Sequence, residues 1–301
     1  MDDSKKLRNY LLWAFGLAWP LQGVAAWLAR HETLSPALRQ SGFTGALAVS
    51  MFAPLAALLL ARVPLRSLGW KPNLKGNVRW YLAAWLLPPV LCTLGAALYY
   101  LLFPAHFDGT GAAYLATLPP EAREQLAAQG LSATSFFLLS ALSAMAYASF
   151  LNVIPCLGEE TGWRGFLTPQ LTRRLGRVKG LLLSGAIWGA WHWPVIIFAG
   201  YEYGLAYWGA PVLGPLLFCA ITTALGILFS LLYEKVGSIW VCALAHGAFN
   251  AFANLPSLLL VPDSGFQQTV GPFANGVIGG LPLMLLAAFV LLRKEPAAEK
   301  M

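Results

Sequence analysis

Charge is scarce in this sequence. Of its 301 residues, 11% are charged and 58% are hydrophobic, and the mean hydropathy is +0.62. Soluble domains usually carry about a quarter of charged residues, so the composition excludes a soluble domain and indicates an integral membrane protein. The net charge of +7 fits basic loops that face anionic headgroups. We therefore expect the lipid bilayer, and no nucleic acid, as the partner of the basic residues.

The sequence also lacks the strongest signatures of several enzyme and metal-site classes. Its cysteines form no CxxC pair, which argues against a disulfide framework and a thiolate metal site; they are Cys92, Cys156, Cys219 and Cys242. No GxSxG element and no HExxH element is present. A serine hydrolase and a HExxH-type zinc protease therefore have no support, and we expect the cysteines to be small buried side chains.

Long apolar runs are abundant, and each is long enough to cross about 30 Å of hydrocarbon as a helix. Backbone groups in lipid must be hydrogen-bonded internally, and no strand-like alternation is present, so we expect helices. The prediction is an all-α, polytopic transmembrane bundle of about eight spans in a single membrane domain, 1–301. The expected spans lie near 10–29, 41–61, 80–103, 139–158, 180–199, 211–232, 237–257 and 273–292.

The distribution of Lys and Arg sets the expected orientation. If the N-terminus is cytoplasmic, most of the 20 basic residues fall on the inner side, in agreement with the positive-inside rule. We therefore predict that both termini are cytoplasmic. The first apolar run has no small-residue cleavage site before Arg30 and is expected to remain as a span. The composition favours a bacterial cytoplasmic membrane as the location.

Two outer connections stand out. The longest runs over about 104–134, and its stretch "PPEAREQLAAQGL" has a proline start and a glycine stop, which predicts a short surface helix. The aromatic stretch "YEYGLAYWGA" (201–210) is typical of a membrane interface. We interpret its Glu202 as a solvated loop acid.

The stretch "GEETGWRGFL" (158–167) places Glu159, Glu160 and Arg164 in an apolar region. Charged groups inside a bilayer are costly and usually mark a functional site. We place the inner boundary of this span near Arg173, which buries the acids by about 20 Å at 1.5 Å per residue. In this register, Pro169 is expected to break the helix.

Two further spans carry an imidazole at a similar depth. His192 lies about 18 Å, and His246 about 14 Å, from the expected inner boundary of its span. The two spans run in the same direction, so both histidines approach the level of Glu159. Asn250 follows His246 by one helical turn. We therefore expect these side chains to converge in one pocket, open toward the cytoplasm or laterally to lipid.

Helical spacing adds detail to this set. Glu160 and Arg164 are separated by four residues and can form an ion pair; Trp188 and His192 have the same spacing, which puts an aromatic ring beside the imidazole. Each polar residue by itself could serve only to hold helices together. Glu159 differs, because the nearby cation is expected to pair with Glu160. A buried carboxylate without a cationic partner suits a general base.

The set predicts a water-based hydrolysis. A carboxylate and an imidazole, Glu159 and His192, can deprotonate a water that attacks a peptide carbonyl. A second imidazole and an amide, His246 and Asn250, can donate hydrogen bonds to the developing oxyanion. Zinc remains an alternative cofactor, since Glu159, His192 and His246 form a known type of ligand set, but we favour catalysis without a metal.

Three motifs resemble those of the CAAX protease and bacteriocin-processing family of membrane endopeptidases, also called Abi. "EETGWRGFL" is similar to its EExxxR motif, "WGAWH" to its aromatic-xxx-His motif, and "HGAFN" to its HxxxN motif. The resemblance covers about 139–255, the expected catalytic core. Trp188 stands where the family often has Phe, which changes pocket size and not chemistry.

The resemblance implies an intramembrane endopeptidase that acts on a membrane-associated peptide or a lipidated protein. It implies that Glu159 and His192 activate the water and that His246 with Asn250 forms the oxyanion site. Glu160, Arg164, Trp163 and Trp188 would support them. Two other classes stay open: a proton-coupled transporter that uses the same titratable groups, and a non-catalytic membrane scaffold or immunity protein.

Overall fold

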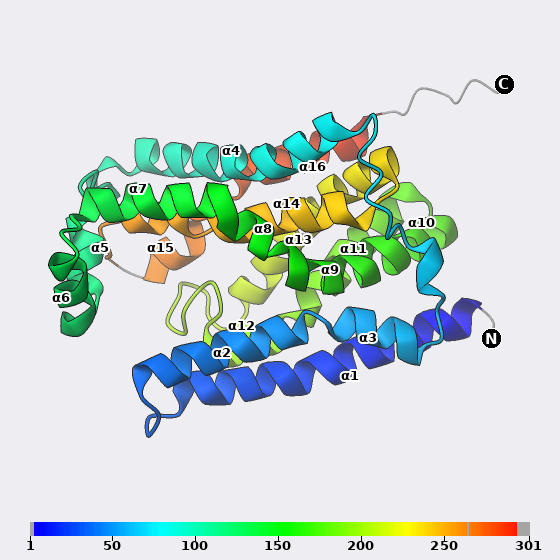
Figure 1. The fold of residues 1–301 in the computed structure, drawn as a ribbon, viewed down its shortest axis with the longest axis horizontal. Helices are drawn as coiled ribbons and strands as arrows, with labels where there is room; N and C mark the ends of the chain where they lie inside the picture. Colours follow the sequence, from blue (N-terminus) through cyan, green and yellow to red (C-terminus); the bar gives the residue numbers. More distant parts are fainter. Residues whose placement is uncertain (1–2, 264, 294–301) are drawn as a thin grey trace.

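The computed structural model describes residues 3–263 and 265–293. The protein is an elongated bundle whose long helices run roughly parallel to its longest axis (Figure 1). Within the described residues the only β pairing is an isolated bridge between Phe107 and Leu260. The all-α prediction is confirmed. In chain order the α-helices are α1 (Asp3–Arg30), α2 (Pro36–Ser50), α3 (Ala53–Leu60), α4 (Val78–Leu102), α5 (Ala112–Thr117), α6 (Pro120–Ala128), α7 (Ala133–Ser143), α8 (Ser149–Leu151), α9 (Val153–Gly162), α10 (Thr168–Leu175), α11 (Arg177–Trp191), α12 (Trp193–Ala199), α13 (Leu213–Val236), α14 (Ile239–Phe252), α15 (Gly265–Val270) and α16 (Leu281–Leu292).

Six helical segments of the described chain are long and apolar enough to cross a membrane. They correspond to the first six predicted spans, with α2 joined to α3, α7 to α8, and α11 to α12. The helices at the last two predicted positions are shorter: α14 has 14 residues and α16 has 12. The protein is thus a polytopic membrane bundle, and the count of eight spans stays a prediction.

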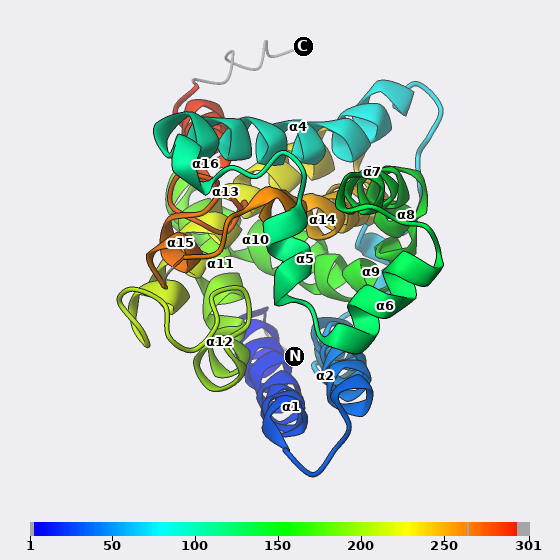
Figure 2. The ribbon, with the colours of Figure 1, turned by 90° about the vertical axis from the view of Figure 1, so that its left-hand side faces the viewer.

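The first and last described helices, α1 and α16, have their outer ends at the same end of the bundle. In Figure 1, α1 starts and α16 finishes at the right-hand end, together with α10, while α5, α6 and α15 lie at the opposite end. The predicted surface helix in the connection after α4 is present as α6, which stops before Gly130 with its φ of +68°. Figure 2, which looks along the bundle from that end, shows α5 and α6 in front of the long helices.

The fourth predicted span is helical over a longer stretch than one crossing, and its breaks differ from the prediction. Pro169 lies in the first turn of α10, which continues directly from helical backbone at Leu167, so the chain stays helical through the proline and the prediction that it breaks the helix was wrong. The chain instead turns at Asn152, between α8 and α9. A π-helical turn, Trp163–Leu167, joins α9 to α10.

Close packing of α11 against α13 depends on small side chains. A Cβ added at Gly189 would lie 2.5 Å from the Cα of Cys219 and 2.7 Å from Oγ1 of Thr222. Only glycine permits this approach of the two backbones. α13 then ends at Gly237, whose φ of +66° is a left-handed conformation that favours glycine. Ser238 caps the start of α14 by accepting from the N–H of Trp240, and this turn sets the position of the residues on α14.

Candidate active site

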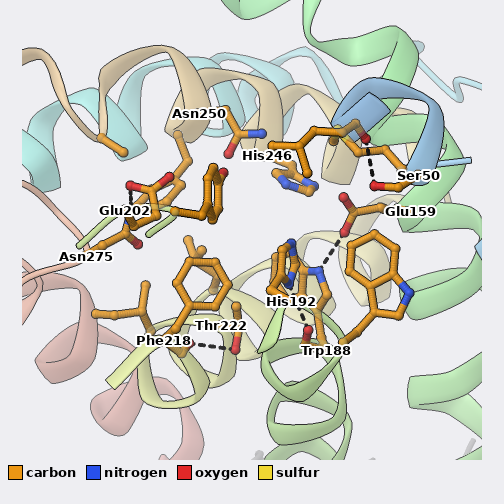
Figure 3. A pocket seen from close by; sticks show the side chains of 18 of the residues that line it. Ser50, Glu159, Trp188, His192, Glu202, Phe218, Thr222, His246, Asn250 and Asn275 are labelled. Carbon is orange, nitrogen blue, oxygen red and sulfur yellow. Dashed lines mark hydrogen bonds between the residues drawn. The ribbon is translucent and has the colours of Figure 1, made fainter. Parts of the chain in front are cut away.

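The polar residues of the central helices line one cavity of about 230 Å³. Glu159 comes from α9, His192 from the junction of α11 and α12, and His246 and Asn250 from α14. Figure 3 shows Glu159 and Trp188 on one side of this cavity, with the two imidazoles next to them. The structure therefore brings together the four residues that the sequence predicts to meet.

The Glu159 carboxylate is held by two indole groups. Nε1 of Trp163 donates to its Oε2 at 3.1 Å, and Nε1 of Trp188 donates to the same oxygen at 2.6 Å. Glu159 is 1% exposed and forms no ion pair with a described Lys or Arg. Its other oxygen, Oε1, accepts from no described residue. One carboxylate oxygen is thus fixed, and the second remains for a water in the cavity.

Glu160 lies at the centre of a separate buried network. Its carboxylate accepts from Nε and Nη2 of Arg164, the latter at 2.6 Å, and from Nδ1 of His246 at 2.9 Å. Glu160 and Arg164 are 0% and 1% exposed, so the predicted ion pair is confirmed and is buried. The guanidinium also stacks over the ring of Trp188, 4.2 Å from its centroid. Arg164 therefore supports both acids, one directly and the other through Trp188.

The hydrogen bond of His192 fixes which of its nitrogens can accept a proton. Its Nδ1 lies 3.0 Å from the carbonyl oxygen of Trp188, and a carbonyl can only accept, so this nitrogen carries the hydrogen. The neutral ring then presents Nε2 as an acceptor. His192 is half-buried and lines the cavity. This is the protonation state that a base requires.

His246, in contrast to His192, must be protonated to act in the cavity. Its Nδ1 donates to the Glu160 carboxylate, so Nε2 becomes a donor only when the ring is protonated. The adjacent carboxylate stabilises that cation. Asn250 lies one turn further along α14 and is exposed to the cavity. Both groups can then supply N–H donors to an oxyanion.

Residues 140–252 match the family model described as type II CAAX prenyl endopeptidase Rce1-like. These residues contain all three motifs of the site. Over these residues the chain is similar to the CAAX protease and bacteriocin-processing family.

The chain is also similar to a curated relative, the CAAX prenyl protease 2 of Methanococcus maripaludis. The two are 26% identical over 153 residues, which cover 50% of this chain and 52% of the relative. The match spans about half the length of that protein. The similarity over residues 140–252 is therefore to a class of peptidases.

Several residues of the cavity were missed by the sequence analysis. Gln22 on α1 and Asn275 before α16 line it but lie outside the Rce1-like region. Glu202, which the sequence analysis interprets as a solvated loop acid, is half-buried, lines the cavity and accepts from two asparagines. That interpretation was wrong, because the loop after α12 folds back over the cavity. A neutral amide inside an apolar run, as at Gln22, is the signal that could have pointed to this part.

The residues of the zinc alternative are already engaged with other groups. One oxygen of Glu159 accepts from two indoles, and Nδ1 of His246 donates to Glu160. Over residues 3–263 and 265–293, no three His, Cys, Asp or Glu side chains are arranged to hold a metal ion. Within the described residues, Glu159, His192 and His246 are thus not gathered into a preformed three-ligand site, and zinc dependence stays a prediction to be tested.

Cys156 lies close to the site but outside its cavity. Its thiol is fully buried, and its Sγ is 3.8 Å from Nδ2 of Asn250. It is not among the residues that line the cavity. All four cysteines are free; three of them are buried as the sequence predicts, whereas Cys219 is half-buried. A substrate in the cavity therefore does not reach the Cys156 thiol, which argues against a role of Cys156 as the nucleophile.

Proposed function

We propose that the protein is an intramembrane endopeptidase that hydrolyses a peptide bond of a membrane-associated substrate with a water activated by Glu159 and His192. The observation that carries this proposal is the environment of Glu159. Two indole donors fix one of its oxygens, and the other faces the cavity that His192, His246 and Asn250 share. The similarity of the Rce1-like region to a peptidase family supports the same reaction.

The reaction follows from the donors and acceptors of the cavity. A water donates to Oε1 of Glu159 and to Nε2 of His192 while its oxygen attacks the carbonyl carbon of the substrate. The proton moves to one of these two bases, and the carbonyl oxygen becomes an oxyanion. The protonated His246 and the amide of Asn250 donate to that oxyanion, an effect worth about 10²–10³-fold per donor in comparable sites.

Collapse of the tetrahedral species breaks the C–N bond. The proton taken from water is then given to the leaving amine, and the acid product keeps the water oxygen. Each step uses the chain's own residues. No step requires a metal, and we propose a glutamic type of peptidase in preference to a zinc enzyme.

The substrate class is proposed from the setting of the site. A cavity within the bundle suits a peptide that is tethered to the membrane, either by its own apolar segment or by a lipid. The relative in Methanococcus maripaludis is named as a prenyl protease, which supports a lipidated protein as one form of the substrate. We place the protein in a bacterial cytoplasmic membrane.

The test uses the purified protein in proteoliposomes with a panel of membrane-tethered peptides, both lipidated and unlipidated. We expect cleavage by the wild type and a loss of about 10²–10⁴-fold in Glu159→Gln, the range of general base catalysis. Glu121→Gln, which changes an exposed acid on α6, is the matched control and should keep the wild-type rate.

Two further arms separate the alternatives. Cleavage that persists in the presence of a zinc chelator supports the glutamic mechanism, whereas cleavage that requires added zinc contradicts it. Proton or solute flux that Glu159→Gln abolishes, in liposomes where no peptide is cut, would favour a transporter. Normal cellular function in Glu159→Gln would favour a scaffold.

A further inference from the structure

The part of the cavity furthest from Glu159 is built around a second carboxylate. Glu202 lies in the loop between α12 and α13, and its Oε2 accepts from Nδ2 of Asn254 at 2.9 Å and from Nδ2 of Asn275 at 2.7 Å. Figure 3 shows Glu202 and Asn275 on the opposite side of the cavity from Glu159. The peptidase mechanism does not use any of these three residues.

This end of the cavity has an acceptor without a donor. Asn275 is 2% exposed, and its Oδ1 is buried without a hydrogen-bond partner. Since Nδ2 of the same side chain donates to a carboxylate, which can only accept, the amide orientation is fixed by chemistry. Buried amide oxygens are nearly always satisfied. This one lacks a donor that a ligand can supply.

A second buried acceptor belongs to the same cavity. Gln22 on α1 is fully buried and donates from Nε2 to the carbonyl oxygen of Trp191 at 2.9 Å, which leaves its Oε1 unpaired. Two residues that line the cavity, Asn275 and Gln22, thus each carry a buried amide oxygen without a hydrogen-bond partner. These amide oxygens and the carboxylates of the cavity are all hydrogen-bond acceptors, which an N–H donor of a ligand can satisfy.

Apart from the imidazolium of His246, which is paired with Glu160, the charged side chains that line the cavity are acidic. Glu159 and Glu202 both line it, and no Lys or Arg is among the described residues that do so. Glu202 also forms no ion pair with a described Lys or Arg. A carboxylate of a ligand would be repelled here, whereas an ammonium or guanidinium group would pair with Glu202 and donate to Asn275.

We propose that Glu202, Asn254 and Asn275 form a subsite for a cationic group of the peptide substrate. The two asparagine amides hold the Glu202 carboxylate in place, and Asn275 adds its own oxygen as a second acceptor. The cation is an alkylammonium or guanidinium group, supplied by a Lys or Arg side chain or by the amino terminus of the peptide. The identification of the ligand as a peptide substrate rests on the proposed function, whereas the binding of a cation rests on the cavity alone.

The test measures binding and cleavage separately. Binding is measured in nanodiscs that contain the Glu159→Gln variant, which is expected to leave the peptide uncut. The ligand is one membrane-tethered peptide made in matched forms. A single position carries Lys, norleucine or Glu, and the position is moved along the peptide. The amino terminus is free or acetylated. These forms distinguish a side-chain cation from a terminal one.

We expect the Lys form, at one position, to bind at least about tenfold more tightly than the norleucine form, and the Glu form to bind more weakly than both. The ratio of Lys to norleucine should fall to about one in Glu159→Gln/Glu202→Gln. It should persist in Glu159→Gln/Glu124→Gln, which removes an exposed acid on α6. A preference that depends only on the free amino terminus assigns the subsite to that group.

Equal binding of the Lys, norleucine and Glu forms at every position, with no effect of acetylation, overturns the proposal. This result needs only the protein with Glu202 intact, so it does not depend on whether the Glu202 variant folds. Cleavage by the wild type with no such preference overturns the subsite and leaves the peptidase standing. Selective binding without cleavage of any peptide overturns the peptidase and leaves the subsite.

Discussion

The buried network of Glu160, Arg164 and His246 predicts strongly coupled effects on stability. Glu160→Gln would leave the Arg164 guanidinium, which is 1% exposed and already has one nitrogen without a partner, as an uncompensated buried charge. Removal of one partner of such a pair costs about 3–5 kcal/mol. Arg164→Met should cost less than Glu160→Gln, because the carboxylate then keeps His246 as its remaining partner.

The double variant Glu160→Gln/Arg164→Met should lose less stability than either single variant. Both charges are then absent, and replacement of a whole buried ion pair by neutral groups is often close to neutral. The coupling free energy from the double-mutant cycle should therefore be at least about 3 kcal/mol in favour of the native pair.

The buried cysteines provide the assay. Cys92, Cys156 and Cys242 are buried in the folded protein, so their reaction with a thiol-specific dye during an SDS titration reports unfolding. The free energy of unfolding is measured for the wild type, both single variants and the double variant. Losses that simply add in the double variant would refute the reasoning, because they would show that the two charges do not depend on each other.

Three further predictions concern packing, the cysteine and the membrane orientation. Gly189→Ala should lower the free energy of unfolding by about 1–3 kcal/mol because its Cβ meets the backbone of α13; Gly16→Ala, with nothing within 4 Å, should be neutral or stabilise by up to about 1 kcal/mol. Cys156→Ala should reduce peptide cleavage by less than about tenfold, because the thiol lies outside the cavity, whereas the loss of a catalytic nucleophile would reduce the rate far more. A loss near that of Glu159→Gln would contradict a water mechanism. Asn254→Cys in intact cells should react with a membrane-impermeant maleimide, and protection from it would place this end of the bundle inside.

The last of these predictions tests the side of the membrane toward which one end of the cavity opens. The cavity reaches the surface at Asn254, which is exposed. This residue follows the C-terminal end of α14, a helix that runs away from the end of the bundle where α1 starts (Figure 1). If the termini are cytoplasmic, as the basic loops predict, the cavity opens at this point toward the outer side.

The helices and the main polar set could be predicted because their signals are local. An apolar run of about 20 residues in lipid must be helical, and Glu159, His192 and His246 stand out as titratable groups within such runs. The i,i+4 pairing of Glu160 with Arg164 needs only the helical repeat. Pro169 misled the prediction, because a proline breaks a helix in its interior and is tolerated in its first turn.

The far end of the cavity could not be predicted, because its signals depend on tertiary contacts. Gln22 and Asn275 are neutral amides, and a cost on burial appears only when their partners are known. Glu202 has the sequence context of an exposed loop acid. Only the fold shows that Asn254 and Asn275, from segments more than 50 residues away, donate to its carboxylate.

The central claim is that Glu159 and His192 act on one water. The most direct measurement is the single-turnover rate of peptide cleavage, with enzyme in excess, for Glu159→Gln, His192→Ala and the double variant. Residues that act as a unit show strongly non-additive losses, so the double variant should be slower than the slower single variant by no more than about threefold. A double variant whose loss equals the product of the two single losses would contradict the claim, because the two groups would then act independently.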